Sequence, residues 1–137
     1  MKWHIVIALG VLSVTTDLYA DTWGCKNDVE IQCGDVSCAT TKSGEFTPMD
    51  VRFDTRGKFS VCAYSGCWDG KGHVETSESL VMIHKARANW SVPNEAADMR
   101  EDVSIMFSTT DRIALIKAGM FVLPMHCVKE SKRTGWN

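Results

Sequence analysis

Apolar and polar residues alternate in two neighbouring segments, 48–54 (PMDVRFD) and 58–64 (KFSVCAY). A period of two predicts β-strands that each bury one face. The short TRG sequence between them ends in Gly57, which favours a three-residue hairpin loop because glycine accepts a left-handed backbone. In this register Phe53 lies opposite Phe59, so the apolar faces of the two strands coincide. We therefore predict an antiparallel hairpin.

Similar patterns continue towards the C-terminus. The run LVMIH (80–84) is apolar at consecutive positions, which predicts a strand covered on both faces. Residues 87–100, which include Pro93, are expected to form a long loop with one helical turn near NEAADM (94–99). Seven or eight short strands predict an all-β domain, either a small antiparallel barrel or a sandwich. Beyond the hairpin, strands are expected at 72–76, 79–85, 102–108, 112–117 and 120–127.

The N-terminal segment differs from the rest of the chain. Lys2 precedes an apolar run over residues 5–14, and LYA then ends at the small residue Ala20. This order is typical of a secretory signal peptide, and the apolar run is too short to span a membrane. We expect a signal peptide over residues 1–20 and one β domain over 21–137, periplasmic or secreted and free of the membrane after cleavage. The alternative is an anchor that is never removed.

The charge balance is slightly acidic. With Lys2 and Asp17 removed from the 15 basic and 17 acidic residues, the net charge stays at −2. Such a chain has no electrostatic reason to bind nucleic acid or an anionic membrane.

All six cysteines follow the expected signal peptide, and an even number of cysteines behind an export signal predicts disulfides. Six cysteines allow many pairings. The preferred pairing joins neighbours in two local bridges and ties the two ends of the domain together with the third. A bridge of the last kind closes about 100 residues and contributes about 4–5 kcal/mol in the chain-entropy model. The preferred bridges are Cys33–Cys38, Cys62–Cys67 and Cys25–Cys127.

The segment CAYSGCWDG (62–70) is the best candidate for a binding site. A bridge between its two cysteines would hold a tight loop with aromatic side chains, and rigid aromatic residues lose little entropy when they bind. The alternative for Trp68 is an inward position that caps the core. The candidate binding residues are Tyr64, Ser65, Gly66, Trp68 and Lys71.

Other chemistries lack a characteristic motif. The Cys-x4-Cys spacing is not the Cys-x-x-Cys of thiol oxidoreductases. His73, His84 and His126 have no paired metal-ligand spacing, and Ser65 lacks the Gly-x-Ser-x-Gly elbow of serine hydrolases. We therefore predict no catalytic residue, metal or cofactor. The alternatives are a small exported enzyme or metal-handling protein that uses His73 and His126, or an envelope protein without a discrete site.

Several short motifs resemble those of the small periplasmic inhibitors of c-type lysozyme. They are IQCG (31–34), MDVRFD (49–54), FSVCAYSG (59–66), WDGKG (68–72) and the late Cys127. The resemblance implies a disulfide-bearing antiparallel β-barrel whose Ser-Gly and lysine residues enter the lysozyme cleft. Those roles would fall on Ser65, Gly66 and Lys71. Here Tyr64 precedes the Ser-Gly pair, whereas the tyrosine of the family follows it.

The motifs are also similar to those of exported bacterial proteins without an assigned role. Taken together, the patterns predict a soluble exported binding protein. Its most specific form is an inhibitor of a cell-wall hydrolase such as lysozyme, acting through a loop over residues 64–72.

Overall fold

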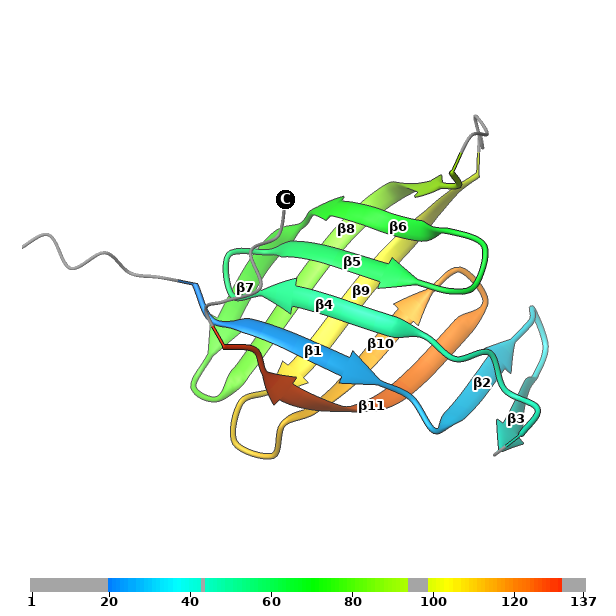
Figure 1. The fold of residues 1–137 in the computed structure, drawn as a ribbon, viewed down its shortest axis with the longest axis horizontal. Helices are drawn as coiled ribbons and strands as arrows, with labels where there is room; N and C mark the ends of the chain where they lie inside the picture. The colour runs from blue at the N-terminus through cyan, green and yellow to red at the C-terminus, as the bar shows by residue number, and fades with distance from the viewer. Residues whose placement is uncertain (1–19, 43, 94–98, 132–137) are drawn as a thin grey trace, which may run out of the picture.

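The computed structural model describes residues 20–42, 44–93 and 99–131 (Figure 1). Residues 1–19 of the expected signal peptide and residues 94–98 of the expected helical turn lie outside this range. Within the described residues, eleven strands form one antiparallel sheet. They are β1 (Thr22–Lys26), β2 (Val29–Cys33), β3 (Cys38–Lys42), β4 (Asp50–Asp54), β5 (Lys58–Cys62), β6 (Cys67–Lys71), β7 (His73–Ser77), β8 (Leu80–Ser91), β9 (Arg100–Ser108), β10 (Ile113–Ala118) and β11 (Phe121–Lys129). The described part of the chain contains no helix long and apolar enough to cross a membrane.

Eight of the described strands close into a barrel, so the all-β prediction is confirmed and the barrel is the form adopted. Their order is β1-β4-β5-β6-β8-β9-β10-β11, and β11 pairs with β1 to complete the ring (Figure 1). Strand β7 follows β6 after Gly72 and pairs with β8. The β2–β3 hairpin extends from the barrel through two residue pairs between β2 and β11.

The predicted hairpin is present as β4 and β5, with Phe53 opposite Phe59. Gly57 has φ 93° in the connecting turn, as a left-handed glycine should. The Asp54 side chain accepts hydrogen bonds from the backbone N–H groups of Arg56 and Lys58, which stabilises the turn. Alternate residues of the barrel strands fill one core. Its fully buried large side chains include Val51, Phe53, Phe59, Val61, Ile83, Val103, Ile105, Phe107, Ile116 and Leu123.

The expected loop over residues 87–100 is wrong in its first part, because β8 continues to Ser91. A register shift between Lys85 and Ala88 interrupts the pairing of β8 with β9, and Arg87 has φ 53°. The Arg87 N–H donates to Asp102 Oδ1 over 2.9 Å. Such a bulge inserts extra residues into one strand, so the period-two pattern that identifies a strand is broken there.

The expectation that residues 80–84 are covered on both faces is also wrong. Val81 and Ile83 point into the core, but Met82 is 39% exposed and His84 is exposed on the outer side of the barrel. Among the described residues, no element packs over this side of β8.

Two buried polar side chains stabilise the place where β2 leaves the barrel. Asn27 Nδ2 donates to the Val29 and Thr47 carbonyls, at 3.2 and 3.1 Å, and its Oδ1 accepts from the Met49 N–H at 2.8 Å. The Glu30 carboxylate accepts from the Thr47 N–H at 2.8 Å. These bonds satisfy backbone groups of the β3–β4 connection that lie beside the core.

All six cysteines are paired, and the bridges are the three preferred from the sequence: Cys25–Cys127, Cys33–Cys38 and Cys62–Cys67. Each joins residues that face each other on neighbouring strands. Three disulfides in a chain of this length are typical of proteins from oxidising compartments.

The Cys25–Cys127 bridge should contribute most to stability. It spans 102 residues in sequence, whereas Cys33–Cys38 spans 5. In the chain-entropy model, the C25A/C127A variant should lose about 4–5 kcal/mol of unfolding free energy and the C33A/C38A variant about 2 kcal/mol. Urea unfolding of both variants, followed by intrinsic tryptophan fluorescence, measures the difference. Equal losses would contradict a stabilisation that acts through loop closure.

The Asn27 side chain is expected to be a second stabilising element. Asn27→Ala removes three hydrogen bonds and leaves buried backbone groups unpaired, so it should cost about 2–3 kcal/mol of unfolding free energy. Asn27→Asp keeps the acceptor for the Met49 N–H but turns a carboxylate oxygen towards the Val29 and Thr47 carbonyls, so it should also lower the free energy of unfolding. A loss under 0.5 kcal/mol for Asn27→Ala, roughly the level of an ordinary surface change, would contradict the role.

Candidate functional site

The turn between β5 and β6, residues 63–66, is the best-defined projection among the candidate binding residues. The Cys62–Cys67 disulfide closes its base, and the Ala63 N–H donates to the Gly66 carbonyl over 2.9 Å. Tyr64 is 82% exposed, and Ser65 is exposed beside it. The covalent bond and the hydrogen bond fix the backbone while both hydroxyl-bearing side chains stay in solvent. We call residues 63–66 the tip.

The tip is packed onto the end of β8. A Cβ added at Gly66 would lie 2.3 Å from the Ser91 carbonyl oxygen and 2.8 Å from the Trp90 ring, so only glycine fits there. The Ser91 hydroxyl also donates to the Cys67 carbonyl at 3.1 Å and the Asp69 carboxylate at 3.0 Å. These contacts hold the tip in one position relative to the barrel.

Trp68 does not belong to the exposed site, which corrects its assignment as a displayed binding residue. It is 3% exposed and packs edge-to-face on Trp90, with 4.3 Å between ring centroids. The reason is strand parity: Cys62 pairs with Cys67, so Trp68 pairs with Val61 and points into the core with it. The signal that could have placed Trp68 is the predicted Cys62–Cys67 bridge beside the strand predicted at 58–64, because a bridge between paired strands puts the next residue opposite Val61.

Lys71 also lies away from the tip, which corrects the expectation of one functional loop over residues 64–72. Residues 67–71 are strand β6, and Lys71 pairs with Lys58 at the far end of β5 (Figure 1). Four residue steps along β6 separate Lys71 from Cys67 at the base of the tip, a distance of about 13 Å. Lys71 is exposed, so it can contact a partner, but only as a separate point of contact.

A shallow hollow beside the tip contains residues that were predicted to form a loop. It has a volume of about 480 Å³, and its far wall is Ser91, Val92 and Pro93. The signal that could have placed this wall is the alternation of Ala88 and Trp90 with polar neighbours. The bulge at Lys85 to Ala88 shifts that alternation out of phase with the first half of β8.

The histidines expected to serve an enzyme or a metal-handling protein are not gathered in one place. His73 on β7 and His126 on β11 lie at opposite sides of a five-strand surface, about 19 Å apart across the strands. Met125 points into the core and Cys127 is in a disulfide, so neither joins His126 as a ligand. Within the residues described, no group of three histidine, cysteine or acidic side chains could hold a metal ion.

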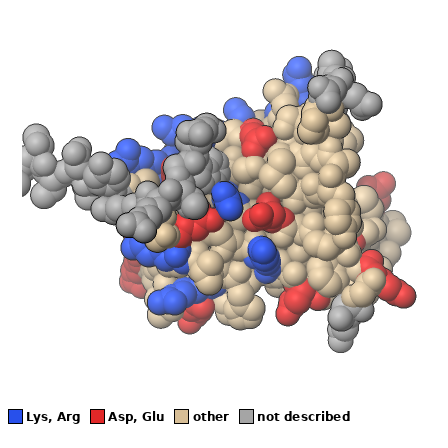
Figure 2. Space-filling view, viewed as in Figure 1, with Lys and Arg blue, Asp and Glu red and all other residues tan. Residues whose placement is uncertain are grey.

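Charges of both signs are interspersed on the visible face of the molecule (Figure 2). Two ion pairs bring opposite charges together: Arg52 Nε lies 3.2 Å from Oε1 of the largely buried Glu130, and Lys129 Nζ lies 2.8 Å from Asp21 Oδ1. Neighbouring opposite charges cancel at a distance, so this face carries no strong field of one sign over its described residues.

Comparison of the chain with protein-family models, with curated proteins and with solved structures found no match.

Proposed function

We propose that the protein is an exported binding protein, periplasmic or secreted, that presents the tip to a protein partner. The observation that carries this proposal is the 82% exposure of Tyr64 on a turn held by the Cys62–Cys67 disulfide. An aromatic side chain on a fixed loop binds with little loss of entropy. The three disulfides support an oxidising location.

The proposed partner is a cell-wall hydrolase such as a lysozyme, and the proposed effect is inhibition. Glycoside hydrolases bind sugars in a cleft that contains two carboxyl groups. The tip is narrow, carries no charge, and offers the Tyr64 and Ser65 hydroxyl groups as donors to such acceptors. Lys71 would reach a different part of the same enzyme, because it lies at the far end of β6, about 13 Å from Cys67 at the base of the tip.

The test is to measure inhibition of c-type lysozyme by the purified protein and by three variants. Tyr64→Ala should weaken inhibition about 10-fold to 100-fold, as expected for the loss of an aromatic anchor. Ser65→Ala should weaken it by roughly 3-fold to 10-fold, as expected for one lost hydrogen bond. Both side chains lie in solvent, so the melting temperature should stay within about 1 °C of the wild type.

Thr110→Ala is the matched control. Thr110 is exposed in the β9–β10 turn, at the end of the barrel opposite the tip, and its removal should leave inhibition unchanged. Inhibition that survives both tip substitutions would remove the tip from the proposed function. A wild-type protein that inhibits neither lysozyme nor any other cell-wall hydrolase would reject the proposed partner class.

A further inference from the structure

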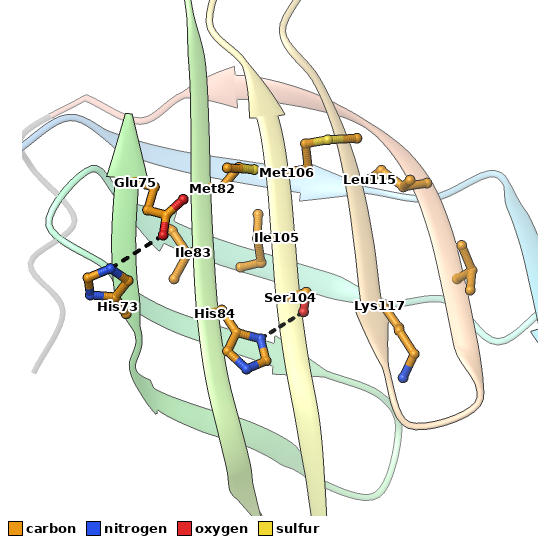
Figure 3. A pocket seen from close by; sticks show the side chains of 11 residues that line it. His73, Glu75, Met82, Ile83, His84, Ser104, Ile105, Met106, Leu115 and Lys117 are labelled. Carbon is orange, nitrogen blue, oxygen red and sulfur yellow. Dashed lines mark hydrogen bonds and ion pairs between the residues drawn. The ribbon is translucent and has the colours of Figure 1, made fainter. Parts of the chain in front are cut away.

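Five adjacent strands present a second surface on the outside of the barrel, remote from the tip. Their outward side chains form cross-strand rows, because each residue is the register partner of the next. We call the two central rows the outer face (Figure 3). One row is Glu75, Met82, Met106, Leu115 and Pro124, and the next is His73, His84, Ser104, Lys117 and Val122.

The centre of the outer face is apolar and partly open to water. Met82, Met106 and Leu115 are neighbours on β8, β9 and β10, and their exposed fractions are 39%, 43% and 41%. They lie in a hollow of about 540 Å³. Strand alternation fixes them outside, because the residues on either side of them fill the core. A contiguous apolar surface of this kind on a small protein is typical of an interaction site.

Opposite charges stand on opposite sides of this apolar centre. Glu75 lies two strands from Met106 in one direction, and Lys117 lies one strand away in the other (Figure 3). Glu75 Oε1 is 3.6 Å from His73 Nε2, and Lys117 Nζ donates to the Gly119 carbonyl at 3.1 Å. Both side chains remain exposed, so each can also reach a group on a partner.

This arrangement is complementary to itself. A two-fold axis that passes through Met106 in the plane of the outer face, inclined to the strands, brings Met106 against its own copy. It brings Met82 towards Leu115 of the second copy and Glu75 towards Lys117 of the second copy. We infer that the outer face binds a second copy of this chain in a symmetric dimer.

The area of the outer face sets the strength of that dimer. The next outward row consists of Ser77, Leu80, Ser108, Ile113 and His126. With this row included, three rows on five strands about 4.8 Å apart, with side-chain margins, cover roughly 500 Å² per protomer. Two such faces bury roughly 1,000 Å² in total, below the standard size of a stable interface. The dimer should therefore be weak and exchange rapidly, with a dissociation constant on the order of micromolar.

Sedimentation velocity over a range of concentrations tests the inference. The wild-type protein should change from monomer to dimer as its concentration rises through the micromolar range. Met106→Lys places two unpaired charges on the axis and should raise the dissociation constant at least roughly a hundredfold. Val36→Lys is the matched control, since Val36 is 96% exposed on the β2–β3 hairpin, and it should leave association unchanged.

A charge exchange identifies the interface more closely. Glu75→Lys and Lys117→Glu should each raise the dissociation constant roughly 2-fold to 10-fold, because each replaces two attractive contacts with repulsive ones. An equimolar mixture of the two variants should associate as well as the wild type, because two opposite pairs then form between unlike protomers. If either substitution weakened association by disturbing the fold, mixing the two variants would not restore the wild-type dissociation constant.

Three results would overturn the inference. The first is a wild-type protein that stays monomeric at concentrations of hundreds of micromolar. The second is a dimer that Met106→Lys leaves intact, which would use another surface. The third is a monomer whose outer face is protected from solvent by another segment of its own chain, detected as slow oxidation of Met82 and Met106. Each result is independent of lysozyme inhibition, so the dimer and the proposed function can fail separately.

Discussion

The pairing of β1 along both of its edges turns this sheet into a barrel. Trp23 and Cys25 lie opposite β4 on one side and opposite β11 on the other. Without β1, both neighbours would present open edges, which readily pair with other chains, and the core would be open along one side. This contact joins the most distant parts of the domain, so it carries the largest loop-closure entropy. The Cys25–Cys127 bond lies within this contact and removes much of that entropy from the unfolded chain.

How far the sequence predicts this fold depends on the range of each interaction. The β4–β5 hairpin was predictable because the alternating apolar residues, such as Phe53 and Phe59, and the turn glycine, Gly57, lie within a few residues of one another. The bulge before Ala88 was not, because a left-handed arginine has no sequence signature and reverses the alternation that follows it. Closure of the barrel could be anticipated only through the pairing of Cys25 with the last cysteine, since strand propensity does not say which edges meet.

The candidate surfaces show the same difference between features set by neighbouring residues and features set by distant ones. Tyr64 and Ser65 were found because a turn between two close cysteines is a local feature. Trp68 and Lys71 were assigned to the same loop because strand β6 has only five residues and contains an Asp-Gly pair, which is typical of a turn. The outer face arises from residues on five strands, and its apolar row exists only once those strands are in register. Strand β8 connects the two surfaces: its end supports the tip, and its first half supplies Met82.

The Asp21–Lys129 contact, at 2.8 Å, has a consequence for how the domain can be attached to something else. It lies where the first and last strands meet beside the β4–β5 turn, at the end of the barrel away from residues 63–66 (Figure 1). A tether fused to either strand, whether a surface anchor or a neighbouring module, would therefore leave from the same point. The attached domain would therefore present Tyr64 at the end that faces away from the anchor or module.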